Sequence, residues 1–166
     1  MALITLSDIT AKKDVSTHLG GVATQLIEEA ELVDLKPLLG EKFYYDVVTN
    51  KNEAGFSILM NGGNYTYDGF DYSCPGLKRV LIEFAYGKIV FFGNQKSTPF
   101  GNVVKTYQDG QVSDRGASKE RYTESSKVAM ALWNDVKLYL DRVDLFDNWN
   151  CAVSKTSRGF KLTHIR

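Results

Sequence analysis

The chain is poor in the residue types that build metal and catalytic sites. Its 166 residues include two cysteines, Cys74 and Cys151, and two histidines, His18 and His164, at opposite ends of the sequence. Two cysteines form no disulfide framework and fit a reducing compartment. A zinc site needs about four clustered ligands, and the sequence offers no such cluster. We therefore expect no metal site, no cofactor and no catalytic histidine.

Long apolar runs and an excess of charge of either sign are also missing. No run approaches the ~20 apolar residues that span a membrane, and Met1–Leu6 lacks the regions of a signal peptide. Lys and Arg together number 20, as do Asp and Glu, so the formal net charge is zero. This balance argues against a general nucleic-acid or membrane binder.

No motif indicates an enzyme. Gly20-Gly21 precedes a predicted helix, but the Gly-Lys-Ser/Thr of a phosphate-binding loop does not follow. The Gly-x-Ser-x-Gly motif of hydrolases is absent. Asp141, Asp144 and Asp147 recur every three residues and could bind a divalent cation. The favoured interpretation is a half-exposed helix end, because apolar residues alternate with these acids.

The chain is long enough for one domain, and its hydrophobic content of 43% is typical of a soluble globular protein. A first helix is predicted from apolar spacings of four, four and three at Val22, Leu26, Ala30 and Val33. The acids of this stretch are expected to face solvent: Glu28, Glu29 and Glu31. Pro37 favours the first turn of a second helix that stops near residues 50–52.

Two longer helices form the centre of the prediction. Leu77–Phe92 is apolar on most sides, which is typical of a helix at the centre of a bundle. Its polar strip consists of Lys78, Arg79, Glu83, Gly87 and Lys88. The last helix is expected over Ser118–Val143, with a stripe at Tyr122, Ser125, Ala129, Leu132, Val136, Tyr139 and Val143. Near the start, Leu3–Leu6 is expected to be extended, and Ser7-Asp8 to cap a brief helix.

Two excursions interrupt the helices. Tyr65–Tyr72 alternates aromatics around Asp68-Gly69, which predicts a β-hairpin. Its aromatics could stack on nucleic-acid bases, but the two aspartates among them would repel phosphates, so packing on the bundle or on a neighbouring subunit is favoured. Residues 97–117 are too long for an ordinary connection and contain β-branched and aromatic residues, which predicts an extended arm.

The fold class predicted from these patterns is mainly α: a bundle of about three to four helices with β-hairpin and extended-arm excursions. Residues 1–149 form the helical domain, with the hairpin at about 65–72 and the arm at about 97–117. Residues 150–166 form a basic C-terminal arm. All 20 acids lie at or before Asp147, whereas four basic residues follow it. This tail is either an arm that contacts an acidic partner or a solvated terminus, and its apolar anchors are Trp149, Phe160, Leu162 and Ile165.

Four motifs occur in an order that resembles a family of tailed-bacteriophage proteins. They are Ile-Glu-Glu-Ala-Glu at 27–31, Leu-Lys-Pro-Leu-Leu-Gly-x-x-Phe-Tyr at 35–44, a Tyr-x-Tyr-x-Gly hairpin running into Gly-Leu-Lys at 65–78, and Thr-Pro-Phe-Gly-Asn-Val-Val at 98–104. By these motifs, residues 2–150 resemble the head–tail connector adaptors, also called head-completion or ring proteins, of phages that infect gut Bacteroidales-type hosts.

The resemblance implies a helical bundle with extended arms and no enzymatic activity. Members are made in the host cytoplasm and assemble in the virion as a ring, commonly of twelve copies, beneath the portal. They join the portal to stopper or tail proteins, and DNA passes through the lumen with transient, non-specific contact. No membrane partner is implied.

The segments expected to reach neighbouring proteins are the arm and the tail. The expected interface residues are Pro99, Phe100, Val103, Val104, Tyr107, Trp149, Lys155, Arg158, Phe160, Lys161 and Arg166. Two other classes of protein stay open. One is a metal-dependent accessory protein of phage that uses the three aspartates at 141–147, and the other is a small DNA-binding protein that uses the basic tail.

Overall fold

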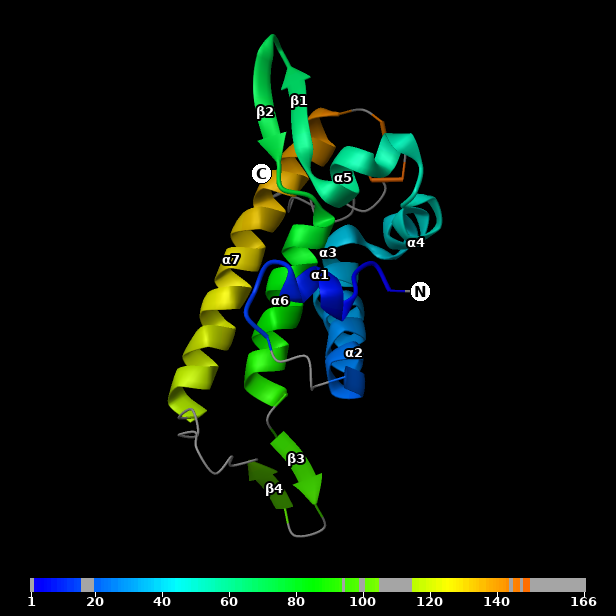
Figure 1. The fold of residues 1–166 in the computed structure, drawn as a ribbon. Coiled ribbons are helices and arrows are strands. Elements are labelled where there is room, and N and C mark those ends of the chain that lie inside the picture. Colours follow the sequence, from blue (N-terminus) through cyan, green and yellow to red (C-terminus); the bar gives the residue numbers. More distant parts are fainter. Residues whose placement is uncertain are drawn as a thin grey trace, which may run out of the picture.

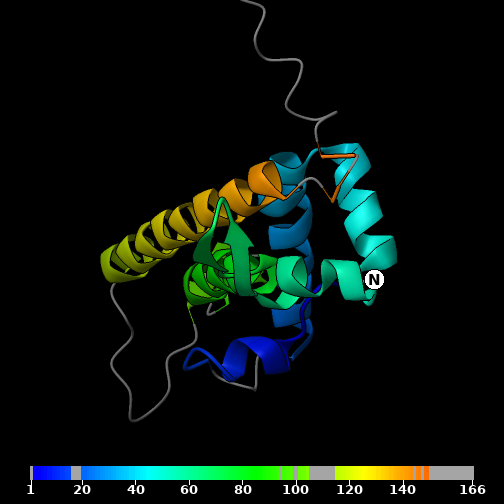
Figure 2. The ribbon, with the colours of Figure 1, turned by 90° about the horizontal axis from the view of Figure 1, so that it is seen from above.

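The computed structural model describes residues 2–15, 20–93, 95–98, 101–104, 115–143, 145–146 and 148–149. Its main feature is an antiparallel pair of helices, α6 (Leu77–Phe92) and α7 (Arg115–Arg142), which lie along each other (Figure 1). Seen from above, α6 lies between α7 on one side and α1 (Leu6–Thr10) and α2 (Gly20–Glu29) on the other (Figure 2). The predicted mainly α fold with a hairpin excursion is confirmed.

Helix α6 is central because nearly every face of it is apolar. It is 16 residues long, and its buried residues face α1, α2, α5 (Ser57–Asn61) and α7. At Gly87 the partner helix comes close, since an added Cβ would lie 3.2 Å from the Tyr122 ring and 3.3 Å from Ser125 Cβ. The predicted bounds of this helix, Leu77–Phe92, are confirmed.

Helix α7 begins three residues earlier than predicted and ends one residue earlier. Its buried residues recur at spacings of three and four, and they are Ser125, Ala129, Trp133, Val136, Tyr139 and Leu140. This stripe is the heptad-like face that the sequence predicts, packed against α6. The core of the domain therefore lies between α6, α7 and the N-terminal helices.

The N-terminal helices depart from the prediction. After α2 the chain forms a π-helical turn, η2 (Ala30–Leu35), before α3 (Lys36–Leu39). A π turn has more residues than the 3.6 of an α-helix, so it shifts the buried face along the sequence. Of the predicted face, Leu26 and Ala30 are buried, whereas Val33, in the π turn, and Val22, near the start of α2, are exposed. The α-helical periodicity therefore predicted the middle of this face correctly and its two ends incorrectly.

Glu31 is the clearest consequence of that shift. It was expected to face solvent but is buried. Its carboxylate accepts hydrogen bonds from the Leu3 backbone N–H at 2.9 Å and from the Tyr44 hydroxyl at 2.7 Å. Burial, together with the Glu31 carboxylate, raises the pKa of the Tyr44 hydroxyl. Glu31 therefore ties the N-terminal segment and α4 (Glu41–Asn50) to η2.

The N-terminal cap and the second helix also differ from expectation. Thr5 caps α1 in a capping box with Asp8, two residues before the start of the predicted Ser7-Asp8 cap. Pro37 lies in the first turn of α3, as predicted. Gly40 then divides the predicted second helix into α3 and α4, because its φ of +76° interrupts the helical backbone. A short 3-10 turn, η3 (Ala54–Phe56), leads into α5.

Two antiparallel hairpins lie at opposite ends of α6 (Figure 1). The first, β1 (Gly63–Tyr67) and β2 (Phe70–Cys74), precedes the helix, and the second, β3 (Gln95–Thr98) and β4 (Gly101–Val104), follows it. Asp68 and Gly69 both have positive φ, as a two-residue hairpin turn requires. The first hairpin is the one predicted, and the second forms part of the predicted arm at 97–117.

Candidate partner-binding surfaces

The β1–β2 hairpin carries all its aromatic residues on one face. Residues directly opposite each other in an antiparallel pair share a face, and so do residues two apart in one strand. Tyr65 pairs with Tyr72 and Tyr67 pairs with Phe70, so these four rings form one aromatic face. The opposite face is polar, and there the Thr66 hydroxyl donates to Asp71 Oδ1 at 2.8 Å.

The inner half of the aromatic face packs on the helical body. The Tyr65 ring stacks on Tyr72 with centroids 5.6 Å apart and meets the Tyr139 ring edge-on at 4.9 Å. From the last residue of α7, Arg142 Nη1 donates to the Tyr65 hydroxyl at 3.0 Å, and the guanidinium lies 4.1 Å from the Tyr72 centroid. These contacts hold the base of the hairpin against the end of α7.

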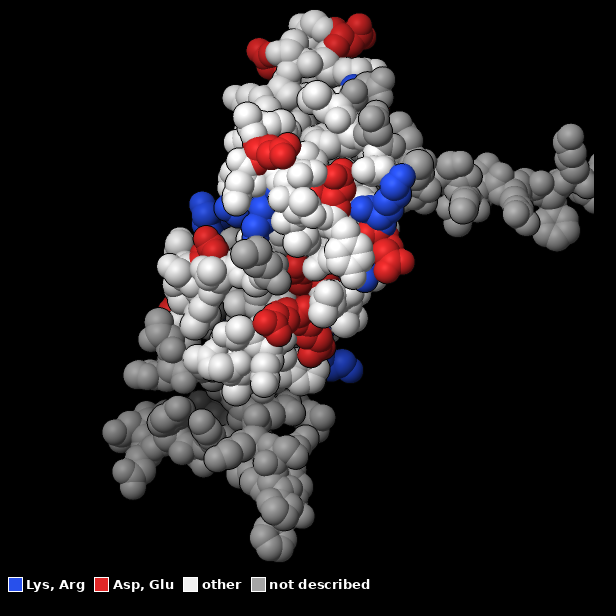
Figure 3. Space-filling model, turned by 90° about the vertical axis from the view of Figure 1, so that its right-hand side faces the viewer, with Lys and Arg blue, Asp and Glu red and all other residues white. Residues whose placement is uncertain are grey.

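The outer half of the same face extends beyond the body. Tyr67 is 45% exposed and Phe70 is 66% exposed. Asp68 and Asp71 lie beside them, and Figure 3 shows acidic side chains at the end of the molecule to which the hairpin projects. An exposed aromatic pair next to acidic groups is suited to a partner that is both apolar and basic.

Trp149 requires a correction. It was expected at a partner interface, but it is only 2% exposed and packs in the chain's own core, 5.5 Å from the Phe43 ring centroid and 6.0 Å from that of Trp133. Its Nε1 donates to Asp141 Oδ1 at 2.7 Å. Trp149 therefore closes the core at the C-terminal end of the body, and Asp141, predicted as a possible cation ligand, is engaged by it.

The other predicted site residues are only partly placed. Val103 and Val104 lie in β4, at the end of α6 opposite the first hairpin. Of the remaining predictions, these residues lie outside the described part of the chain: Pro99, Phe100, Tyr107, Asp144, Asp147, Lys155, Arg158, Phe160, Lys161 and Arg166. Of the predicted interface residues the structure describes only Val103, Val104 and Trp149, so the other interface assignments stay predictions.

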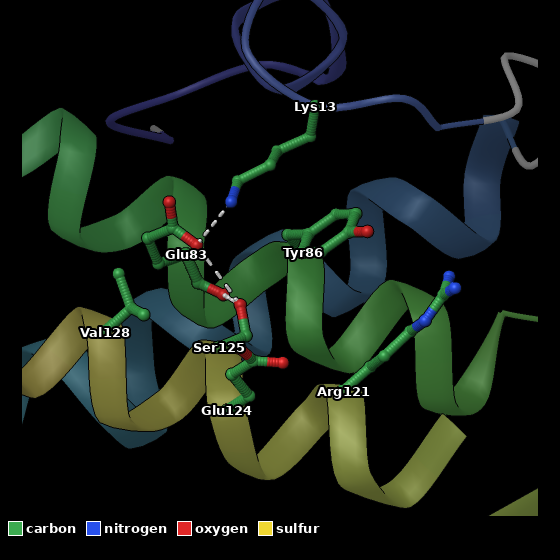
Figure 4. Close-up of a pocket in the computed structure, with 7 residues that line it drawn as sticks. All are labelled: Lys13, Glu83, Tyr86, Arg121, Glu124, Ser125 and Val128. Carbon is green, nitrogen blue, oxygen red and sulfur yellow. Dashed lines mark hydrogen bonds and ion pairs between the residues drawn. The ribbon is translucent and has the colours of Figure 1, made fainter. Parts of the chain in front are cut away.

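The structure also contains a charged site that the sequence analysis did not identify. Glu83, a member of the predicted polar strip of α6, is 1% exposed and pairs with Lys13 Nζ at 2.8 Å. From α7, the Ser125 hydroxyl donates to the Glu83 carbonyl at 2.8 Å and lies 3.3 Å from its carboxylate. Figure 4 shows Lys13 and Ser125 converging on Glu83 from two sides.

These groups line an open hollow of about 280 Å³ between α6, α7 and the segment after α1 (Figure 4). Its other lining residues include Tyr86, Arg121, Glu124 and Val128. Lys13 also lies 5.0 Å from the Tyr86 ring centroid. Since Lys13 and Ser125 both engage Glu83, this arrangement fastens the N-terminal segment to the helical pair.

A second buried charge lies on another face of α6. Lys88 is 4% exposed and pairs with Glu29 at 3.0 Å and with Asp34 at 3.3 Å. Burial raises the pKa of Asp34, and this effect exceeds the lowering by Lys88. The signal in the sequence was the presence of Glu83 and Lys88 between apolar residues in the middle of α6. It shows that polar partners are needed but does not identify them.

A metal-binding cluster and a membrane-spanning helix are both missing from the described residues. Within the residues that the structure describes, no three or more His, Cys, Asp or Glu side chains gather as a metal ion would need. No helix in that part of the chain has the length and apolar character to cross a membrane.

Comparison with known proteins identifies the family. No curated protein and no solved structure matches the chain. The sequence model of a family of unknown function, DUF6712, matches residues 35–159. The match runs from the end of η2 through both hairpins and α7, and so covers most of the described body. The chain therefore belongs to the DUF6712 family.

Proposed function

We propose that this protein is a structural virion protein, a head–tail connector adaptor of a tailed phage. In this role it forms a ring beneath the portal, joins the portal to stopper or tail proteins, and lets DNA pass through the lumen. The observation that carries the proposal is the position of two projecting hairpins at opposite ends of one central helix (Figure 1). An adaptor needs separate contact surfaces at its two ends.

The connections between the hairpins and α6 are short. Two residues separate β2 from α6, and two separate α6 from β3. At 1.5 Å per residue, the 16 residues of α6 are about 24 Å long. The length of α6 therefore sets the distance between the two points from which the hairpins start. Such a spacer suits a protein that must contact two partners at once.

The fold and the charge of the chain also support an adaptor. A closed ring needs head-to-tail contacts in which each copy uses two different surfaces, and the two hairpins differ in sequence. The resemblance of the four motifs implies a helical bundle with extended arms, which is the fold class of this chain. A formal net charge of zero suits a lumen along which DNA slides, because strong phosphate attraction would hold it.

Electron microscopy of the protein with its portal would test the proposal. We expect rings, of about twelve copies if the family resemblance holds, stacked coaxially on the portal and open along the axis. Purified virions labelled at this protein should show the label at the head–tail junction and no label in the tail fibres. Failure to bind portal, together with absence from the virion, would contradict the proposed function.

A pair of substitutions would test the second hairpin. Replacing Val103 and Val104 by Asp in β4 should impair ring formation on the portal while circular dichroism keeps its helical signal. Met130→Asp with Leu138→Asp on the exposed face of α7 is the matched control, since it adds the same charge away from both hairpins. If both variants form rings on the portal equally well, β4 is not part of the interface.

A further inference from the structure

The first hairpin has the features of an incomplete sheet. It consists of β1 and β2 alone, and neither strand has a second strand neighbour in the described part of the chain. The outer edge of each strand therefore offers backbone N–H and C=O groups that a third strand could pair. Two-stranded sheets are marginal in water and gain from such an addition.

The two faces of this sheet define what a third strand should contain. Along the free edge of β2 it would lie beside exposed Phe70 on the aromatic face, with exposed Tyr67 one strand further away. On the polar face it would lie beside Asp71, and Asp68 is in the adjoining turn. A fitting strand therefore alternates apolar residues with basic or polar ones, as side chains of a strand point alternately to the two faces.

One segment of this chain has that alternation. Residues 158–166 read Arg-Gly-Phe-Lys-Leu-Thr-His-Ile-Arg, in which Phe160 and Leu162 alternate with Lys161 and Thr163. The segment contains three basic residues and no acid. Paired with the hairpin, it would place Phe160 and Leu162 on the aromatic face and Lys161 on the face of Asp71. The charge matches, and the apolar pattern matches over residues 160–163, whereas Ile165 would fall on the polar face.

We propose that the β1–β2 hairpin of one copy binds residues 158–166 of a neighbouring copy as an added strand. The inference rests on the proposed ring and names the contact between its subunits. Between buried Trp149 and Arg158 lie eight residues, which span up to about 28 Å when extended. The proposed contact therefore requires the hairpin of the adjacent subunit to lie within this distance of Trp149. Repeated from copy to copy, a contact between two different surfaces closes a ring.

Peptide binding tests the pairing without requiring assembly. The full chain with Phe160→Ser and Leu162→Ser keeps its hairpin but has no competing tail. A fluorescent peptide of residues 158–166 should bind this variant saturably, and its affinity should fall about tenfold or more when Tyr67→Ser and Phe70→Ser are added. A peptide with serine at both apolar positions is the control. Equal binding of both peptides, or no binding, would overturn the proposal.

A mixing experiment tests whether the strand comes from another copy. The hairpin variant (Tyr67→Ser, Phe70→Ser) can only donate its tail, and the tail variant (Phe160→Ser, Leu162→Ser) can only accept one. Neither should self-associate in analytical ultracentrifugation, and their mixture should form a dimer that grows no further. Leu138→Ser, at an exposed position of α7, should assemble like the unaltered chain. No dimer in the mixture would show that the tail binds no hairpin, and a dimer in the mixture beside an unaltered chain that stays monomeric would show that the tail binds its own hairpin.

Charge exchange offers a variant that keeps the aromatic residues. Asp71→Lys should weaken peptide binding, and a peptide with Lys161→Asp should restore it in part. If the Lys161→Asp peptide binds the Asp71→Lys variant no better than the unaltered peptide does, the tail binds in another register and the proposed alternation is contradicted. These outcomes are distinct from failure of the adaptor function. If hairpin and tail variants still form rings on portal, the pairing is wrong and the adaptor stands; if the unaltered chain never binds portal, the adaptor function fails.

Discussion

The inner and outer halves of the hairpin's aromatic face have the same chemistry in opposite environments. Tyr65 and Tyr72 pack against Tyr139 and Arg142 of α7, whereas Phe70, in the next pair along the strands, is 66% exposed. Nothing in the alternation of residues separates the two pairs. The difference arises because α7 ends at Arg142, whose guanidinium lies 4.1 Å from the Tyr72 centroid but 5.6 Å from that of Tyr67, so the support of the body weakens towards the tip. Burial at the base serves folding, and exposure at the tip leaves a surface for a partner.

The largest effect should come from a substitution at Gly76, in the connection between β2 and α6, on which the position of the whole hairpin depends. At Gly76 the backbone has a φ of +81°, and an added Cβ would collide with the backbone of Asn61 and Gly62. We expect Gly76→Ala to cost about 3 kcal/mol or more, since both strain and overlap oppose it. Gly69→Ala is the control, because φ is also positive there but the space is open. Similar melting temperatures for both variants would show that the backbone adjusts.

Two lysine side chains show the same contrast between a buried and an exposed position. Lys88 is buried with Glu29 and Asp34, whereas Lys137 of α7 is exposed. Lys88→Met leaves Asp34 without its cation, and we expect a loss of about 2–3 kcal/mol, less than for a fully buried pair because Glu29 is half exposed. Lys137→Met should change stability by less than about 0.5 kcal/mol. Urea unfolding measures both.

That pairing also has a pH dependence whose sign can be stated. Although burial of Lys88 acts to lower its pKa, the hydrogen bond to Glu29 and the charge of Asp34 raise it overall. A raised pKa on a cation gives stability that is present below the unfolded value of about 10.5 and is lost above it. The unaltered chain should therefore lose more stability between pH 10 and 12 than Lys88→Met does. If the free energies of unfolding of the two proteins, measured in urea, change in parallel with pH, the pair does not contribute to the pH dependence.

The inner aromatic half should matter for stability and only indirectly for binding. Tyr65→Ala removes the ring contacts with Tyr72 and Tyr139 and the hydrogen bond from Arg142. We expect a loss of about 2 kcal/mol, because the ring is partly buried. Tyr65→Phe keeps the ring contacts and should recover more than half of that loss. An unchanged melting temperature in Tyr65→Ala would mean that the hairpin is not supported by the body.

Features set by neighbouring residues could be predicted from the sequence. The bounds of α6 and the hairpin turn follow from local periodicity and from Asp68-Gly69. Buried Glu31 could not be predicted, because its partners lie 13 and 28 residues away and a π turn moves it inward. Glu83 is similar, with Ser125 42 residues away. Trp149 was assigned to the tail because no sequence signal shows that Phe43 and Trp133 surround it.

The smallest effect on stability, at the tip of the hairpin, is the most informative about function. Phe70→Ala removes a ring that is 66% exposed, so the free energy of unfolding should change by less than about 0.5 kcal/mol. If the tip is a binding surface, the same substitution should weaken association between copies about tenfold or more. Tyr65→Ala is predicted to lower the free energy of unfolding and to affect association only indirectly. Urea unfolding and sedimentation of both variants would therefore show which residues of the hairpin stabilise the fold and which bind another copy. Equal losses of stability in the two variants would show instead that the whole aromatic face is one structural unit.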